Sequence, residues 1–263
     1  MTERNKLLSR FGFSFARGGT HTARTIMLDE LRELLSNVGS PDAQKSDYQR
    51  AVENENCLLK RTGQTRSRTY QHLVDLYSLD RNIVLFRNLV HFWEKDTDAQ
   101  PLLALLCAYA RDPILRATAP FILACQEGSI VTRQAVETFI NELEPGRFSD
   151  ATLKSTAQNI NSSWTKSGHL SGQAIKVRSR AQPAPGAVSY ALLLGYLTGV
   201  RGRALFETEY TKLLDCGFDQ SLELAQEASR KGWIVVNRVS DIIEVLFPRL
   251  INKEEMEWLR EQS

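Results

Sequence analysis

Two consecutive apolar segments near the middle of the chain constrain its fold most strongly. Residues 102–110 and 114–125 carry apolar side chains on almost every side, and Asp112 and Pro113 stand between them. A helix that is hydrophobic all round has to be buried by other elements. Pro suits a first helical turn, and Asp before it suits the N-cap. We therefore expect these segments to form the buried centre of a helical bundle.

Apolar residues at helical spacing continue through most of the remaining chain. Further helices are expected over residues 26–38, 46–59, 66–77, 82–93, 131–143, 149–166, 188–198, 204–214 and 219–231. Clear strands are expected only over 233–239 and 242–247, which flank Ser240-Asp241 as a short hairpin. The predicted fold class is therefore mainly α, with a short C-terminal β-hairpin.

Charge is distributed unevenly, although the formal net charge is only +2. Residues 1–150 contain 19 basic and 19 acidic residues, whereas residues 151–206 contain seven basic residues and no Asp or Glu. Residues 207–263 contain seven basic and twelve acidic residues, which makes this part net −5. Phosphates attract Lys and Arg, and nearby carboxylates weaken that attraction. The acid-free segment is therefore the main candidate for contact with nucleic acid.

The order of elements around this segment is typical of a winged helix-turn-helix. A helix over 131–143 ends at Glu144-Pro145-Gly146, and the helix over 149–166 follows. A basic, alternating stretch over 173–180 comes next and resembles a wing. In helix-turn-helix modules the second helix lies in the major groove of DNA. Its inward face is expected to consist of Leu153, Ala157, Ile160 and Trp164.

Candidate contacts follow from this arrangement. Gln158 and Asn159 are suited to hydrogen-bond base edges from the helix over 149–166. The basic residues suited to phosphate contact are Lys154, Lys166, Lys176, Arg178, Arg180, Arg201 and Arg203. The alternative is that Lys and Arg solvate exposed faces, and that Asn and Ser mark helix ends.

Two further basic groups lie nearer the N-terminus. Residues 17–24 form a glycine-rich loop ahead of a helix, and its amides could hold a phosphate. It lacks the Gly-Lys-Ser/Thr ending of a nucleotide-binding loop. We expect either an ordered arm that touches the DNA backbone through Arg17 and Arg24 or a flexible lead-in. The second group, in a loop that either extends the DNA footprint or solvates a turn, is Lys60, Arg61, Arg66 and Arg68.

No pattern typical of catalysis or metal binding occurs in the sequence. The four cysteines and four histidines lack metal-ligand spacing. No Gly-x-Ser-x-Gly elbow, paired acids or His-Glu-x-x-His motif is present. The apolar run over 190–200 is too short to span a bilayer, and no signal peptide is recognisable. We expect no enzyme activity, no metal, no cofactor and no membrane contact, with the cytoplasm as compartment.

Several segments resemble the BrxA family, small accessory proteins of BREX phage-defence systems. They are residues 28–35, 51–60 (AVENENCLLK), 102–120, 162–170 (SSWTKSGHL) and 233–248. The resemblance implies a helical, DNA-binding protein with a bundle of the NusB type, which works beside larger BREX proteins. It supplies no binding residue, so the candidates above rest on charge and pattern.

These observations predict a non-enzymatic protein that binds double-stranded DNA as an accessory component of a BREX system. One alternative is a scaffold that docks larger partners through its acidic C-terminal region. The other is an RNA-binding bundle, because phosphate contacts do not distinguish the two nucleic acids. The expected organisation is a basic arm over 1–25, a bundle over 26–128, a winged-helix-like basic module over 129–186, and a helical region over 187–263 with a hairpin at 233–247. This hairpin follows a helix, so one or two winged modules are expected.

Overall fold

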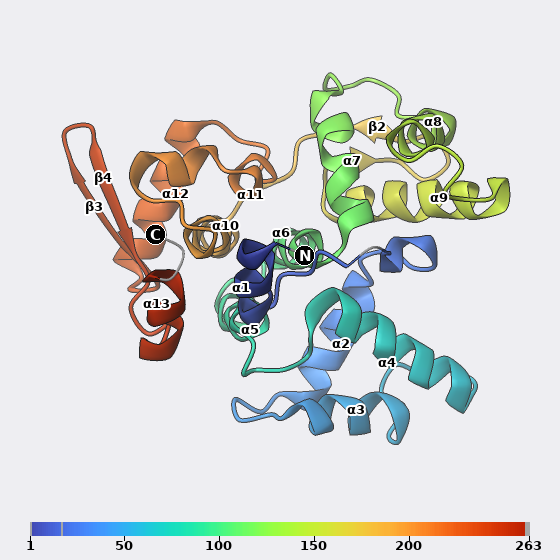
Figure 1. Ribbon diagram of the computed structural model, residues 1–263, viewed down its shortest axis with the longest axis horizontal. Helices are drawn as coiled ribbons and strands as arrows, with labels where there is room; N and C mark the ends of the chain where they lie inside the picture. The colour runs from blue at the N-terminus through green and yellow to red at the C-terminus, as the bar shows by residue number, and fades with distance from the viewer. Residues whose placement is uncertain (1, 17, 261–263) are drawn as a thin grey trace.

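The computed structural model describes residues 2–16 and 18–260 (Figure 1). This part of the chain is mainly helical with two short antiparallel hairpins, which confirms the predicted fold class. Helix α6 (Gln100–Arg111) lies at the centre and contacts α4, α5, α7, α9 and α10. Every residue from Leu102 to Ala110 is buried, as its apolar sequence predicts.

The remaining elements follow in chain order. The N-terminal helices are α1 (Glu3–Phe11), the 3-10 helix η1 (Thr20–Thr22), α2 (Leu28–Val38), α3 (Lys45–Glu53), α4 (Gly63–Tyr77) and α5 (Val84–Lys95). After α6 come α7 (Pro113–Ala124), α8 (Arg133–Leu143), α9 (Asp150–Lys166), β1 (Leu170–Ser171) and β2 (Val177–Arg178). The C-terminal elements are α10 (Pro185–Leu197), the 3-10 helix η2 (Gly202–Glu207), α11 (Glu209–Lys212), α12 (Phe218–Arg230), β3 (Val235–Val239), β4 (Ile242–Leu246) and α13 (Lys253–Arg260).

The helix that shares the core with α6 is α10 rather than α7. All of α10 is buried, and it packs on α5, α6, α11 and α12. Helix α7 buries Ile114, Leu115 and Ile122 but leaves Ala117 and Ala124 exposed. The expectation of a fully buried α7 is therefore wrong. The exposed apolar positions in α7 are Ala117, Pro120 and Ala124, whose small side chains cost little when left in water.

Elements α7 to β2 have the order of a winged helix-turn-helix. Strands β1 and β2 pair antiparallel through Leu170–Arg178 and Ser171–Val177. An isolated antiparallel bridge between Ile130 and Val177 places β2 between β1 and the segment ahead of α8. The wing, residues 172–176, joins the two strands. Its first residue, Gly172, has φ +88, and a Cβ there would collide with Ile175 O, so the turn requires glycine.

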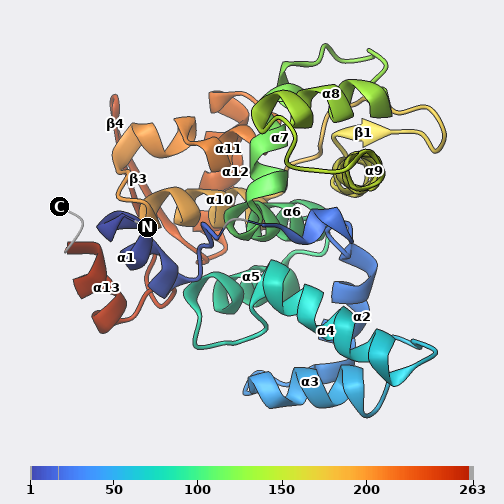
Figure 2. The same ribbon diagram turned by 45° about the vertical axis from the view of Figure 1, so that its right-hand side comes forward.

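A similar order recurs in the C-terminal part. Helices α10, α11 and α12 precede the β3–β4 hairpin, and η2 packs on both α12 and β4. The strands pair antiparallel from Val235–Leu246 to Val239–Ile242. Figures 1 and 2 show this C-terminal group and the α7–β2 group on opposite sides of α6. The fold thus contains two groups with winged-module order.

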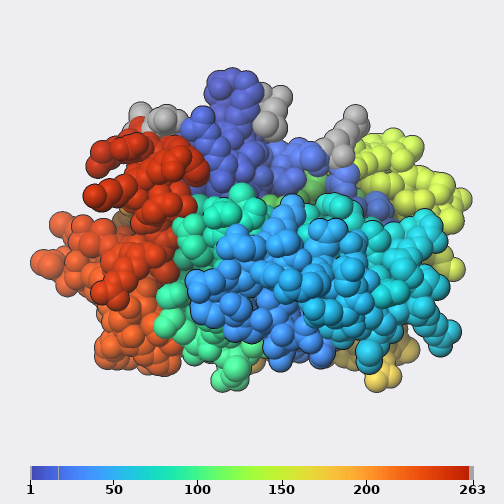
Figure 3. All heavy atoms as spheres, turned by 90° about the horizontal axis from the view of Figure 1, so that it is seen from below, coloured from blue at the N-terminus to red at the C-terminus, as the bar shows by residue number. Residues whose placement is uncertain are grey.

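The N-terminal segment is packed against the body instead of extending from it. Leu8, Phe11 and Phe13 are buried, and the ring of Phe11 lies 5.6 Å from that of Trp258 in α13. Arg116 Nη2 donates to Ser14 O at 3.0 Å. Figure 3 shows α1 at the upper rim, between the C-terminal part and α9. In the part that the structure describes, the basic arm over residues 1–25 is thus packed against other elements and does not form the flexible lead-in that was the alternative.

Across residues 2–16 and 18–260, no helix has the length and apolar composition that crossing a membrane requires.

Candidate nucleic-acid interface

Helix α9 is fixed by the apolar stripe that its sequence predicts. Ala157, Ile160 and Trp164 are fully buried, and Leu153 is half-buried. Trp164 Nε1 donates to Thr118 Oγ1 of α7 at 3.2 Å, and its ring lies 4.9 Å from that of His169. This packing turns the opposite face, with Lys154 and Gln158, toward solvent.

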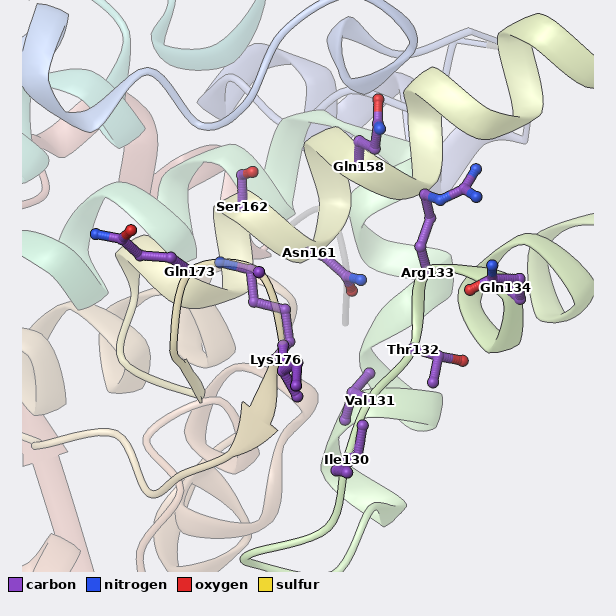
Figure 4. A pocket seen from close by; sticks show the side chains of 12 residues that line it. Ile130, Val131, Thr132, Arg133, Gln134, Gln158, Asn161, Ser162, Gln173 and Lys176 are labelled. Carbon is purple, nitrogen blue, oxygen red and sulfur yellow. The ribbon is translucent and has the colours of Figure 1, made fainter.

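A cleft of about 550 Å³ lies between α9, the first turn of α8 and the wing (Figure 4). We call it the wing cleft. It is lined by residues 130–134, by 173–176 of the wing, and by Gln158, Asn161 and Ser162 of α9. None of these residues is Asp or Glu, whereas Arg133 and Lys176 are cationic. The cleft therefore favours anionic ligands.

The cations around the cleft are held loosely or not at all by carboxylates. Lys176 Nζ donates to Gly172 O at 2.7 Å. Arg133 pairs with Glu137 one turn along α8 while its side chain stays 29% exposed. Lys154, on the exposed face of α9, has no ion-pair partner among the described residues. Lys154 and Lys176 form no ion pair among the described residues, so both are available to a ligand, whereas the charge of Arg133 is shared with Glu137.

Arg178 does not belong to this surface. Its Nη1 and Nη2 donate to Asp215 Oδ2 and Oδ1, each at 2.7 Å. Its Nε donates to Ile122 O at 3.1 Å, and the side chain is only 6% exposed. The expectation that Arg178 contacts DNA is therefore wrong, because its charge is already neutralised inside the protein. Arg178 positions strand β2 and ties it to the loop after α11.

Other candidates in the acid-free segment are also engaged by the body. Lys166 forms an ion pair with Asp29 of α2. Asn159 Nδ2 donates to His21 O at 3.0 Å, so the amide of Asn159 anchors η1 and does not face DNA. The expectation of base contact by Asn159 is therefore wrong. Arg180 lies 3.7 Å from Glu127, but both side chains are more than 60% exposed, so Arg180 remains accessible.

Arg201 and Arg203 lie beside the other group of elements. Arg201 flanks η2, donates to Tyr196 O at 2.7 Å and stacks 3.6 Å over the Tyr196 ring. Arg203 lies 4.0 Å from Glu207 and 4.3 Å over the Phe218 ring. Because η2 contacts α10, α11, α12 and β4, these arginines do not join the surface around α9.

Part of the N-terminal basic group lies next to α9. Helix η1 contacts both α4 and α9. Burial lowers the pKa of His72 in α4, the nearby Arg24 and Arg68 lower it further, and Asp75 acts in the opposite sense. Arg24 and Arg68 therefore both lie near His72, next to the η1 segment that contacts α9. Arg68 is exposed, and Arg24 is half-buried.

The rest of that group contributes less. Lys60 pairs with Glu30 at 3.2 Å, and Arg66 Nη1 donates to Glu53 O at 2.9 Å. Arg61 is exposed at the start of α4. Arg17 lies outside the described residues.

The glycine-rich loop holds a carboxylate of its own chain. His21 N donates to Asp112 Oδ2 at 3.2 Å, and a Cβ at Gly19 would lie 2.6 Å from Asp112 Oδ1. Burial tends to raise the pKa of Asp112, but His21 and backbone N–H donors hold that pKa below its ordinary value. The loop is thus occupied by a carboxylate, which would repel a phosphate. The expectation of a phosphate-holding loop is wrong for this reason.

Three residues far apart in sequence form a Ser–His–Asp arrangement. His21 Nδ1 lies 2.9 Å from Asp112 Oδ2, and His21 Nε2 lies 2.9 Å from Ser163 Oγ. Ser163 Oγ also accepts from Ile26 N at 3.0 Å and lies 2.8 Å from Asn159 O. All three side chains are at most 2% exposed. A substrate cannot reach this serine, so the arrangement fastens the N-terminal segment to α7 and α9.

Neither a metal-binding site nor a reactive thiol is recognisable among the described residues. No cluster of three or more potential metal ligands occurs within the described residues. The four cysteines are free thiols, and Cys107 is buried, which raises its pKa to about 11.

The interface contains residues that sequence reasoning missed. Arg133, Ile130, Ile175 and Asn161 all line the wing cleft. Asn161 comes three residues after Gln158 in α9, so both lie on one side of the helix, beside the apolar stripe. This spacing is the feature of the sequence that could have indicated Asn161. Arg133 is the residue after Thr132, the N-cap of α8. In a winged module the chain at this position lies close to the wing.

Comparison with known families found no model that matches the chain, and a search of curated proteins returned none with significant similarity. The resemblance to the BrxA family stays a prediction.

Proposed function

We propose that this protein binds double-stranded DNA through the α7–β2 module, without catalysing a reaction. The observation that carries the proposal is the wing cleft. It lies between the helix and the loop that contact DNA in winged modules, and no carboxylate lines it. Gln158 on the exposed face of α9 can hydrogen-bond base edges.

The charges around this face support phosphate contact. Arg133 of α8 and Lys176 of the wing line the cleft, and Lys154 lies one helical turn before Gln158 on the exposed face of α9. Arg24 and Arg68 extend the positive surface across η1 to α4. Arg180 is exposed at the end of β2 and adds a further cation.

Binding of matched nucleic acids at two salt concentrations tests this function. We expect duplex DNA to bind, with an affinity that falls steeply as salt increases, because phosphate contacts release counterions. Duplex RNA and single strands of the same sequence should bind more weakly. Stronger binding to RNA would favour the RNA-binding alternative, and no binding at low salt would contradict the proposal.

A second function, docking of a protein partner, is favoured by the C-terminal group. Helix α12 carries Asp219, Glu223 and Glu227 at four-residue spacing, a charge pattern that repels DNA. At the hairpin tip, Val239 and Ile242 are 73% and 74% exposed. This side is suited to a partner that is basic and partly apolar. The two functions use different faces and are compatible.

By its resemblance to the BrxA family, we further propose that the chain acts as an accessory component of a BREX phage-defence system. Deletion of its gene from a host that carries such a system should then reduce protection against phage. Unchanged protection would contradict this assignment without affecting DNA binding.

A further inference from the structure

The wing cleft contains a buried polar atom that duplex binding does not explain. Asn161 is 4% exposed, and its Oδ1 has no hydrogen-bond partner among the described residues. Native structures leave few such atoms unpaired, because a buried acceptor without a donor is destabilising. Figure 4 shows the Asn161 side chain pointing from α9 into the cleft, between Arg133 and Lys176. The atom is therefore placed to meet a ligand.

The chemistry of Oδ1 restricts what that ligand is. An amide oxygen accepts hydrogen bonds, so its partner has to donate one. A phosphodiester offers only acceptor oxygens and cannot do so. A backbone phosphate therefore satisfies the rim of the cleft but not Asn161 Oδ1.

Two exposed isoleucines give the same cleft apolar surface. Ile130, ahead of α8, is 63% exposed, and Ile175 of the wing is 62% exposed. Large apolar side chains left in water next to a concave surface mark binding sites more often than chance. The volume of about 550 Å³ is within the range of about 300–1,000 Å³ that is typical of small-ligand pockets.

We propose that the wing cleft binds a nucleoside phosphate as one unit. The planar base lies against Ile130 and Ile175 and donates an N–H to Asn161 Oδ1. The phosphate lies at Arg133 and Lys176; no carboxylate lines the cleft, and Glu137, which pairs with Arg133, lies outside it along α8. The ligand is either a free mononucleotide or an unpaired nucleotide of a DNA strand, since both carry the same groups.

This inference goes beyond duplex binding and does not depend on it. In a duplex the N–H groups of the base-pairing edge are engaged and only the second amino N–H of adenine or cytosine faces the major groove, so an unpaired base offers Asn161 donors that a paired base does not. A nucleotide in the cleft also occupies the space between α9 and the wing. Free nucleotide and duplex DNA should therefore compete if both bind.

Asn161→Leu separates binding from folding. Leu has the same branched arrangement of side-chain heavy atoms and removes a buried amide whose oxygen is unpaired, so thermal stability should stay equal or rise. The matched control is Asn237→Leu in β3, the same change at an exposed position of the C-terminal hairpin. Both variants are compared with the full-length parent by calorimetric titration.

The titrants are AMP, CMP, GMP and TMP. Adenosine and inorganic phosphate, which carry only the nucleoside or only the phosphate, are titrated for comparison. We expect at least one mononucleotide to bind about tenfold more tightly than inorganic phosphate, and Asn161→Leu to weaken it about tenfold. Asn237→Leu should bind like the parent. Equal affinity for nucleotide and phosphate, or an unchanged Asn161→Leu, would overturn the proposal.

A second titration identifies the source of the nucleotide. If no mononucleotide binds, a duplex with one unpaired base should bind more tightly than the perfect duplex, and Asn161→Leu should remove that preference. Absence of both effects overturns the proposal. Binding of the perfect duplex is measured in the same experiment. If Lys154→Ala removes this binding and Asn161→Leu does not, the result bears on the proposed function and not on the nucleotide site.

Discussion

Replacing Arg178 by Met tests whether this residue builds the module or binds DNA. The change removes both 2.7 Å contacts to Asp215 and the bond to Ile122 O. It leaves the Asp215 carboxylate only 14% exposed, with Ala181 N as a remaining donor at 3.1 Å. Removing one partner of a buried ion pair costs about 3–5 kcal/mol. For a domain of this size the melting temperature should fall by about 6–20 °C.

A double variant isolates the pair. In Arg178→Met/Asp215→Leu no charge is left buried, so most of the lost stability should return. Denaturant unfolding at pH 7 measures both variants. Burial tends to raise the pKa of Asp215, but Arg178 holds it below the ordinary value. The stability that the Arg178–Asp215 pair contributes is therefore complete at pH values above the ordinary carboxyl pKa. It is lost as the pH falls through the lowered pKa of Asp215. A single variant as stable as the parent would refute the structural role.

Three further predictions concern α9 and its surroundings. Trp164→Ala should lower the unfolding free energy by about 3–5 kcal/mol, because a fully buried ring is lost; a thermally silent variant would contradict the inward face. Burial lowers the pKa of His169 to about 4, so the unfolded chain takes up its proton first and stability falls as pH drops from 6.5 toward 4. Between pH 6.5 and pH 4 the free energy of unfolding of His169→Gln should fall by about 3 kcal/mol less than that of the parent. Equal slopes of unfolding free energy against pH would contradict the account. Gln158→Ala should leave thermal stability unchanged and reduce discrimination among duplex sequences by about 1–3 kcal/mol; an even loss of affinity on all sequences would assign Gln158 to the backbone.

Local patterns predicted the helices well where apolar residues alone decide burial. The stripe of Ala157, Ile160 and Trp164 sets the orientation of α9, and no distant partner changes it. Helix α1 was missed because few of its residues are apolar. Its Phe11 is buried partly against Trp258, which is near the other end of the chain.

The order of elements predicted the winged module, but the charge pattern did not show which of its cations are left without a carboxylate partner. A segment without Asp or Glu in sequence meets carboxylates from elsewhere in space. Asp29 pairs with Lys166, Asp215 with Arg178, and Glu127 with Arg180. These partners belong to other elements, so no window along the sequence could show which cations remain available.

Long-range hydrogen bonds were equally invisible. His21 is 91 positions from Asp112 and 142 from Ser163. The packing of η1 against α7 and α9 brings the three together. Asn159 is engaged by the same packing, which is why a residue with suitable chemistry for base contact proved to be structural.

The salt dependence of duplex binding by Lys154→Ala/Lys176→Ala tests the central claim most directly. The control is Lys212→Ala, which removes one exposed cation from α11 in the C-terminal group. Each phosphate contact contributes about 0.9 to the slope of log affinity against log salt, so the double variant should be shallower by about 1.8. The control should keep the slope of the parent. Equal slopes for all three proteins would contradict DNA binding through the α7–β2 module.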